Sequence, residues 1–246
     1  MSVASGSGID TGAETATGTV TSTATGTASY APTDLTVPTR GRDRAAYDQE
    51  LVHAILDEAY VCHLGFVRDG SPVVLPTLYG RVGERLYVHG STGSRPLRMA
   101  GAAPQEDPGL AVCLTVTHVD GLVLARSAFH HSINYRSVVI HGTAHQVTDP
   151  EEKRTALDAL VDHVVPGRSA DSRPANAKEL AATAVLSLDL AAVSAKVRTG
   201  GPNDDPEDLD LPHWAGVVPL RKGHDPLIPS ADLAPGIDAP DYLIEL

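Results

Sequence analysis

The chain has 246 residues, enough for one large domain, and its 19 Lys and Arg against 31 Asp and Glu give a formal charge of −12. Such a balance repels a nucleic-acid backbone unless the basic residues cluster strongly, so we expect no nucleic acid among its partners. Small basic groups occur at residues 40–44 and 95–98. Each is too small for a polyanion track but suits a single phosphate.

The first 39 residues form a Thr/Ala/Gly-rich N-terminal tail that we expect to be disordered. Every odd position from Thr15 to Thr27 is Thr, with small residues in between. Small side chains cannot offset the entropy of ordering the chain, although the period of two would also suit a strand. The tail lacks the basic start and the apolar centre of a secretory signal.

Two further features predict the compartment. No apolar run is long enough to cross a membrane, so we expect no membrane contact. The only cysteines, Cys62 and Cys113, lie in apolar runs, which predicts two buried thiols rather than a disulfide framework. Together these observations favour a cytoplasmic protein.

After the tail, a helix pattern precedes a series of strand patterns. Apolar residues recur at three- and four-residue intervals over residues 48–59, which predicts an amphipathic helix. β-rich segments at residues 60–67, 72–81 and 85–90 are separated by turn signals of hairpin length. They predict an antiparallel meander, followed by a short helix around residues 97–99.

Strand patterns resume after this helix. Residues 110–119 and 122–125 flank Asp120-Gly121, which predicts a hairpin turn, and residues 136–147 form a long β-branched run. With one face buried, these strands would close into a barrel, because closure removes exposed edges.

The remaining elements are expected to be peripheral. Helical spacing over residues 151–165 ends near Gly167, residues 179–182 predict another short helix, and residues 185–190 predict the last barrel strand. The predicted fold is therefore mainly β, a β-barrel with peripheral α-helices. Its barrel domain spans residues 40–194, and residues 195–246 form an irregular C-terminal segment that packs on the barrel or on a partner subunit.

Residues 86–95 could bind an anion. There a strand ends, and glycines and hydroxyl residues precede Arg95 and a helix start. Backbone N–H groups, hydroxyls and a guanidinium that converge in this way can hold a phosphate. A Gly/Ser-rich surface loop has the same composition, so the pattern alone leaves both interpretations open.

A second polar segment, residues 127–137, contains the adjacent pair His130 and His131. Neighbouring residues on a strand point to opposite faces and do not easily share an ion, so we expect no metal site. A third segment, residues 195–202, is basic and Gly-rich, which a solvated turn would also explain. The carboxylates between Asp204 and Asp210 are expected to form a solvated charge run.

In their order along the chain, these segments resemble the pyridoxamine 5′-phosphate oxidase-like flavoproteins, and within them the nitroimidazole-resistance-type branch. The resemblance covers roughly residues 38–222. It rests on Ala54-Ile-Leu-Asp-Glu-Ala59, Val74-Leu-Pro-Thr-Leu-Tyr79, Leu86-Tyr-Val-His-Gly-Ser91 with Ser94-Arg95, Ser132-Ile-Asn-Tyr-Arg-Ser137, Ser194-Ala-Lys-Val-Arg-Thr-Gly200 and Trp214-Ala-Gly-Val-Val-Pro-Leu220.

The resemblance implies an FMN-binding split barrel that forms a homodimer with the cofactor at the subunit interface. The cofactor-binding residues implied in this way are Leu75, Pro76, Thr77, Leu78, Val88, His89, Ser94, Arg95, Asn134, Tyr135, Arg136, Ser137, Lys196 and Arg198. Pro96 stands where the oxidases proper carry a Lys, and Arg98 is the residue that could replace that cation. The substrate-binding Trp of the oxidases has no counterpart here, so pyridoxamine phosphate is not the expected substrate.

His89 occupies the position of the active-site histidine in the nitroimidazole-resistance branch, so the resemblance implies that it is catalytic. Its imidazole could donate a proton to an acceptor oxygen. The expected function is that of a flavin-dependent oxidoreductase that reduces a small organic substrate such as a nitroaromatic. A histidine that only satisfies a backbone carbonyl is the structural alternative.

Two other functions stay open at this point. One is a haem- or flavin-binding module without turnover, because relatives of this barrel include haem-handling proteins. His63, His89, His130, His131, His141 and His145 are then the candidate axial ligands. The other is a dimeric interaction protein that keeps the barrel but has lost the cofactor.

Overall fold

The computed structural model describes residues 28–101 and 109–244. Its elements in chain order are η1 (Arg42–Arg44), β1 (Ala45–Ala46), α1 (Gln49–Glu58), β2 (Val61–Arg68), β3 (Ser71–Val82), β4 (Arg85–Ser91), α2 (Arg95–Gly101), β5 (Leu110–Leu124), η2 (Ala128–His130), β6 (Ser132–Gln146), α3 (Pro150–Val164), α4 (Ala177–Ala182), β7 (Thr183–Asp189), β8 (Ala192–Arg198), η3 (Pro206–Asp208), β9 (Gly216–Pro219) and α5 (Asp241–Ile244).

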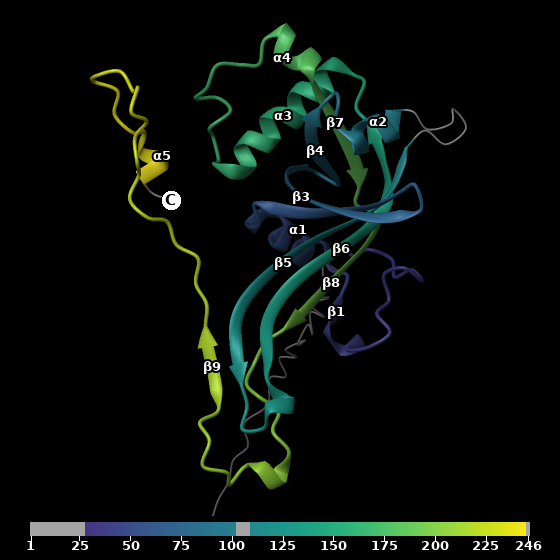
Figure 1. The fold of residues 1–246 in the computed structure, drawn as a ribbon, viewed down its shortest axis with the longest axis vertical. Coiled ribbons are helices and arrows are strands. Elements are labelled where there is room, and N and C mark those ends of the chain that lie inside the picture. Colours follow the sequence, from purple (N-terminus) through teal and green to yellow (C-terminus); the bar gives the residue numbers. More distant parts are fainter. Residues whose placement is uncertain (1–27, 102–108, 245–246) are drawn as a thin grey trace, which may run out of the picture.

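Six of the nine strands close into a barrel. They pair in the order β6-β7-β4-β3-β2-β5, and β5 pairs with β6 to complete the circuit. β8 and β1 extend the sheet beyond β6, while β9 extends it beyond β5. Figure 1 shows the long strands β5, β6 and β8 running side by side, with the helices around them. The prediction of a mainly β barrel with peripheral helices is confirmed.

α1 begins where the sequence supplies a cap. The side chain of Asp48 accepts a hydrogen bond from the Leu51 N–H group, which satisfies one of the free donors at the helix start. The helix then buries Val52, Ile55 and Leu56 completely in the barrel core. Each of these side chains contributes about 2 kcal/mol of hydrophobic free energy on burial.

α3 covers the outside of the barrel. Pro150 opens the helix, and the Asp149 side chain accepts from the Glu152 N–H group. The buried face of α3 forms a second, smaller apolar cluster with β4 and β7, in which Ala156 packs with Tyr87. The helix therefore lies across β3 and β4, as Figure 1 also shows.

One strand prediction was wrong and another is confirmed. The Asp120-Gly121 dipeptide is not a hairpin turn, because β5 continues through it with an irregularity in its pairing to β6 between Val119 and Gly121. This irregularity takes up one extra residue and bends the strand. The strand predicted at residues 185–190 is β7, the last strand of the closed barrel in chain order, and β8 and β9 follow it as extensions of the sheet.

The N-terminal tail expected to be disordered is described in part. Residues 1–27, with the Thr repeat, lie outside the described residues. Tyr30 is only 6% exposed and belongs to the barrel core, where its hydroxyl group donates to Glu84 Oε2 at 2.7 Å. Ordered chain therefore begins before residue 40, contrary to expectation for residues 28–39.

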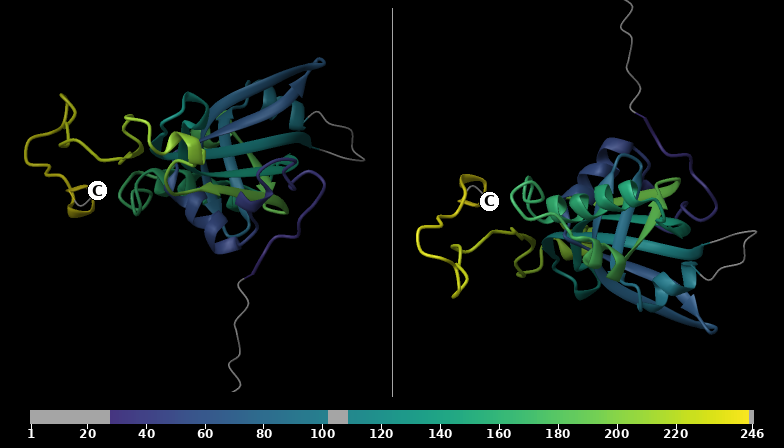
Figure 2. Two further views of the ribbon diagram at one scale, coloured as in Figure 1. Left: turned by 90° about the horizontal axis from the view of Figure 1, so that it is seen from below. Right: turned by 90° about the horizontal axis from the view of Figure 1, so that it is seen from above.

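Residues 216–244 form what we call the C-terminal arm, which projects to one side of the barrel (Figure 2). At its base, Lys222 Nζ donates to Nδ1 of His118 at 2.9 Å, and His118 Nε2 lies 3.0 Å from the Ile55 carbonyl oxygen. A carbonyl only accepts, so Nε2 carries the proton and Nδ1 is the acceptor. His118 is 2% exposed, so this contact fixes the arm to a buried group.

Further contacts hold the arm along its length. The Trp214 ring lies over Gly216 at the start of β9, where an added Cβ would come within 2.9 Å of ring carbons. Farther along, the Tyr60 hydroxyl lies 3.3 Å from His224 Nε2, and the Tyr242 hydroxyl donates to Asp171 at 2.7 Å. The arm is thus attached at both ends.

We expect Gly80→Val to destabilise the fold. An added Cβ at Gly80 would lie 2.8 Å from the backbone carbon of Ala159, so β3 and α3 could not keep their present distance. The free energy of unfolding should fall by about 2 kcal/mol, the usual cost of overpacking. Urea denaturation measures this change. Gly223→Ala is the control, because nothing lies within 4 Å of its added Cβ, and an equal loss in both variants would contradict the explanation.

Candidate functional site

The barrel is split open between β3 and β4. β3 pairs with β2 over residues 71–78, but it pairs with β4 only over residues 79–82. From His89 onwards β4 continues its pairing with β7 alone. In the part of the chain that the structure describes, the β4-side edge of β3 therefore has no ladder partner before Tyr79, and Pro76 also lacks an N–H group there.

A hollow of about 160 Å³ lies in this split. Six of the predicted site residues line it, three from β3, two from β4 and one from the loop before α2: Leu75, Pro76, Thr77, Val88, His89 and Ser94. Its other walls are Leu64, Pro96, Leu97 and Leu186, which sequence reasoning missed. Leu64, Leu97 and Leu186 are buried apolar residues that look like ordinary core positions, so no sequence signal distinguished them.

The loop before α2 is shaped by glycine and serine. An added Cβ at Gly90 would lie 2.7 Å from Leu97 Cδ1, so only glycine lets α2 pack this closely against β4. The Ser91 hydroxyl accepts from the Gly93 N–H group at 3.1 Å, and the Ser91 carbonyl accepts from the Ser94 N–H group at 2.8 Å. This tight turn places Ser94 at the rim of the hollow.

Two arginines without an ion pair among the described residues lie next to the split, at the start of α2. Arg95 and Arg98 are exposed, and neither has an ion pair among the described residues. Pro96, by contrast, is buried, so it fills the wall of the hollow. His89 is exposed beside them. The split thus combines a free strand edge, a hydroxyl group, a guanidinium and an imidazole.

The other predicted site residues lie on β6 and β8, away from the split. Asn134, Tyr135, Arg136 and Ser137 are at the start of β6, opposite Lys196 and Arg198 of β8. Within one subunit the structure therefore brings together the first group of predicted residues but not the second. Leu78 stays outside the hollow on the same strand as Leu75.

Arg136 is held by two carboxylates. Its guanidinium donates to Glu58 at 2.5 and 2.9 Å and to Asp120 at 2.8 and 3.0 Å. Hydrogen bonds from Arg136 keep the pKa of Glu58 and that of Asp120 below their ordinary values. Arg136 therefore ties α1 to β5 and β6.

The histidine pair and the two cysteines lie in different surroundings. His130 Nε2 lies 3.0 Å from Asp205, and His131 Nδ1 lies 3.0 Å from the Ser127 carbonyl oxygen. Among the described residues, no group of three or more His, Cys, Asp or Glu is placed to hold a metal ion. Cys62 is buried, which raises the pKa of its thiol to about 12, and Cys113 is half-buried rather than buried as expected.

The acidic segment after Pro202 is less solvated than expected. Asp204 is only 2% exposed at its side chain and pairs with Arg126 at 2.8 Å. Asp205 pairs with His130, as described above. Part of the predicted charge run is therefore used to hold the chain that follows β8 against the barrel.

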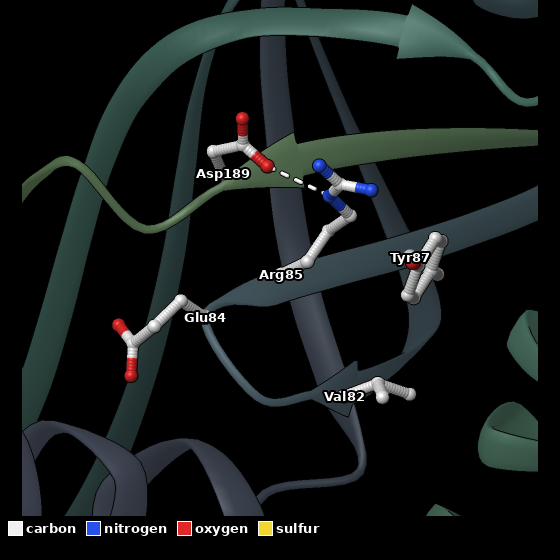
Figure 3. A pocket seen from close by; sticks show the side chains of 5 residues that line it. All are labelled: Val82, Glu84, Arg85, Tyr87 and Asp189. Carbon is white, nitrogen blue, oxygen red and sulfur yellow. Dashed lines mark hydrogen bonds and ion pairs between the residues drawn. The ribbon is translucent and has the colours of Figure 1, made fainter.

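A second hollow, of about 260 Å³, lies beside β4 and is lined by Val82, Glu84, Arg85, Tyr87 and Asp189. Figure 3 shows the Arg85 guanidinium turned toward Asp189, to which its Nε donates at 2.7 Å. Arg85 also donates to Glu152 at 2.9 Å, and the Tyr87 hydroxyl donates to the same oxygen at 3.0 Å. These groups satisfy one another, so the hollow is a junction between β4, β7 and α3.

Comparison with known proteins identifies the family of this barrel. Residues 48–197, more than half of the chain, match the family model described as pyridoxamine 5′-phosphate oxidase. The chain belongs to this family. A search of the curated proteins finds no match. Among the described residues, no helix is long and apolar enough to span a membrane.

Solved structures of this pyridoxamine 5′-phosphate oxidase family extend the match. The flavocytochrome Anf3 from Azotobacter vinelandii is 41% identical, with a TM-score of 0.80, and the match covers 88% of this chain and 98% of Anf3. The FAD and haem binding protein from Mycobacterium smegmatis is 38% identical, with a TM-score of 0.76, over 82% of this chain and 96% of that one.

A third structure supports the fold alone. It is a putative 5-nitroimidazole antibiotic resistance protein from Bacteroides thetaiotaomicron, 23% identical with a TM-score of 0.51, and the match covers 62% of this chain and 86% of that one. One of the two more similar relatives is thus named a flavocytochrome, and the other a FAD and haem binding protein.

We expect Arg136→Met to lower the free energy of unfolding by about 1 kcal/mol at pH 7, because the pair is partly exposed and screened. Both carboxyl pKa values are lowered in the folded state, so this stabilisation is present above their ordinary pKa values and is lost as the pH falls through the folded ones. The difference from wild type should therefore shrink as the pH falls below about 4.5.

Urea denaturation of wild type and Arg136→Met at pH 7 and at acidic pH measures this difference in the free energy of unfolding. Arg154→Met is the control, because Arg154 Nε lies 3.7 Å from an exposed Glu151 and should contribute little. A difference between wild type and Arg136→Met that stays constant with pH would contradict the role of the two carboxylates.

Proposed function

We propose that the protein is an FMN-binding, flavin-dependent oxidoreductase that reduces a small organic acceptor such as a nitroaromatic. The observation that carries the proposal is the split between β3 and β4, where a free strand edge, Ser94 and His89 line one hollow and Arg95 follows Ser94 at the start of α2. Family membership supports a flavin as the ligand of this split.

The residues of the split fit a flavin nucleotide. The free edge of β3 offers backbone groups to the polar edge of the ring, while Leu75 and Val88 offer apolar contact. Arg95 lacks a carboxylate partner among the described residues, and the Ser94 hydroxyl group lies beside it, so both are available to a phosphate. Gly90 keeps the cradle narrow because any side chain there would meet Leu97.

A bound flavin would supply the redox chemistry, accepting electrons from a nicotinamide or deazaflavin donor and passing them to the acceptor. The role of the chain is to hold the flavin, to orient the acceptor beside it and to polarise the acceptor. His89 is exposed at the hollow, where its imidazole can donate a hydrogen bond or a proton to an acceptor oxygen. The leucines of the wall exclude water from one side of the site.

A homodimer is part of the proposal. The hollow measures about 160 Å³, whereas ligand pockets usually enclose about 300–1,000 Å³, so one chain supplies only part of the walls. Exposed apolar side chains continue from the split over β2 and β3, including Val61, Val67 and Val74. A second copy that covers this face would complete the site and bury these side chains.

FMN is the proposed cofactor, and FAD is the flavin named for the relative from Mycobacterium smegmatis. Both carry the phosphate that Arg95 would bind, so the split alone does not favour either. We also propose a cytoplasmic location, which the free thiols of Cys62 and Cys113 support because disulfides are rare there.

The second candidate function is haem binding, alone or beside a flavin. It is favoured by the two relatives, one a flavocytochrome and the other a FAD and haem binding protein, at 41% and 38% identity. His63 fits a haem ligand best among the exposed histidines. It lies on β2 opposite Pro76 of β3, on the same outward face as the exposed Val61 and Val67.

Absorption spectra of the purified protein separate these functions. Two near-visible bands indicate flavin, a single intense Soret band indicates haem, and both together indicate a flavocytochrome. Release of the flavin by heat and chromatography then distinguishes FMN from FAD. A colourless protein that binds neither added flavin contradicts the leading proposal.

We expect Arg95→Met to weaken flavin binding by about tenfold to a hundredfold, because charge-assisted hydrogen bonds to a phosphate contribute about 1.5–3 kcal/mol. Absorption titration of the cofactor-free protein with FMN measures the change. Haem content should stay at the wild-type level. Arg221→Met, on the exposed arm, is the matched control, and equal losses in both variants would remove Arg95 from the phosphate site.

His89→Gln should leave flavin affinity within a few-fold of wild type but lower kcat by about a hundredfold, because the proton donor is lost while the phosphate anchor remains. Steady-state kinetics with NADH or NADPH and a nitrofuran measure the effect. Unchanged kcat in a flavin-loaded His89→Gln variant would assign His89 a structural role.

A further inference from the structure

A separate hollow of about 330 Å³ lies between η1 and the turn that follows β8. We call it the arginine hollow. Its walls are Asp43, Arg44, Val197, Arg198, Thr199, Gly200, Gly201 and Asn203. β1 pairs with β8, and Lys196 Nζ donates to the Arg40 carbonyl at 3.2 Å, so η1 is fixed against the strand. The hollow is therefore a built feature of the barrel edge.

Arg198 is a buried cation without a counter-charge. It is 8% exposed, and its guanidinium donates to Asn134 Oδ1 at 2.5 Å and to the Gly201 carbonyl at 3.1 Å. Both acceptors are neutral. No carboxylate among the described residues forms an ion pair with it, although charged groups at this depth are normally paired. The fold thus leaves one positive charge uncompensated inside the hollow.

A second cation faces the same space. Arg44 is half-buried, lines the hollow, and has no ion pair among the described residues. Asp43 also lines it but is exposed and pairs with neither arginine. Gly200 and Gly201 of the turn also line the hollow, and nothing lies within 4 Å of an added Cβ at either position. The net charge of the walls is positive in a chain whose total charge is −12.

The arginine hollow and the β3/β4 split lie at opposite ends of β6. Arg198 pairs with Tyr135 near the start of that strand, whereas Leu186, which lines the split, pairs with Gln146 at its end. About 11 residues separate these positions, or roughly 35 Å of extended strand. Within one subunit the two hollows do not share a ligand.

We propose that the arginine hollow is a binding site for an oxyanion, the phosphate or carboxylate group of a small molecule, which Arg198 and Arg44 hold together. A dianion there neutralises the buried guanidinium and accepts from both side chains. The flavin resemblance implied a role for Arg198 but not for Arg44 or this hollow. The oxyanion belongs either to a diffusible ligand or to a cofactor bound by a second copy.

Inorganic phosphate is the probe. The full-length protein, as purified and after removal of any cofactor, is unfolded thermally with and without phosphate at constant ionic strength. Phosphate should raise the midpoint of wild type in at least one of these forms. Arg44→Met should weaken phosphate binding about tenfold or more and remove most of the shift. Arg42→Met, on the same turn but outside the hollow, should keep it.

Arg198→Met tests the buried charge itself. Methionine fills similar space without a charge, so without phosphate this variant should be close to wild type in stability, and it should not respond to phosphate. Equal destabilisation with and without phosphate would give Arg198 a purely structural role. If it does not fold, the comparison of Arg44→Met with Arg42→Met decides.

Flavin and haem contents of the same variants identify the source of the oxyanion. A phosphate shift in the protein as purified, with normal cofactor content in Arg44→Met, indicates a diffusible ligand. A shift seen only after cofactor removal, with loss of flavin or haem from Arg44→Met, indicates a cofactor phosphate or propionate. No shift in either form, or equal shifts in wild type, Arg42→Met and Arg44→Met, overturns the proposal. A colourless protein that binds neither added flavin would contradict the flavin function and would leave this result unaffected.

Discussion

β3 changes its pairing partner in mid-strand, and the candidate site depends on that change. Up to Leu78 the strand pairs with β2, and from Tyr79 to Val82 it pairs with β4 instead. The barrel can close elsewhere because β5 and β6 are paired over almost their whole length. Because the β5–β6 pairing closes the barrel, the core stays covered although the barrel is open between β3 and β4. The free edge of β3 can therefore face a ligand.

The arginines of the chain fall into two groups, those that form ion pairs within the fold and those that do not. Most arginines of the barrel face carboxylates: Arg81 pairs with Asp57, Arg85 with Asp189, Arg126 with Asp204, and Arg136 with Glu58. Arg95 and Arg98 at the split, and Arg44 and Arg198 in the arginine hollow, have no such partner among the described residues, and neither do the exposed Arg40, Arg42 and Arg221. In an acidic chain, an external anion binds most favourably beside arginines that have no carboxylate partner.

Much of the barrel could be predicted from the sequence because local patterns and tertiary pairing agree. The helix at residues 48–59 has both its cap and its apolar spacing, and β2, β3 and β4 follow the predicted strand runs within one or two residues. Asp120-Gly121 misled because the dipeptide that forms tight turns also suits a β-bulge. Only the pairing of β5 with β6 on one side and β9 on the other decides between them.

The candidate site was predictable only where its residues are close in sequence. The segment from Val88 to Arg95 contains the glycine and serine residues that form its turn, so the sequence alone placed it at the end of a strand. Arg136 and Glu58 are 78 positions apart in the sequence, and no local sequence pattern predicts their contact. Leu186 belongs to the wall because β7 returns beside β4, which is a property of the topology.

The C-terminal arm has a consequence for how this protein can be observed. Trp214 is the only tryptophan of the chain, it is 67% exposed, and it lies on Gly216 at the point where the arm joins the barrel. The emission of a single indole therefore reports on one location. Detachment of β9 from β5 would alter its surroundings, so the intrinsic fluorescence of the unlabelled protein follows the seating of the arm.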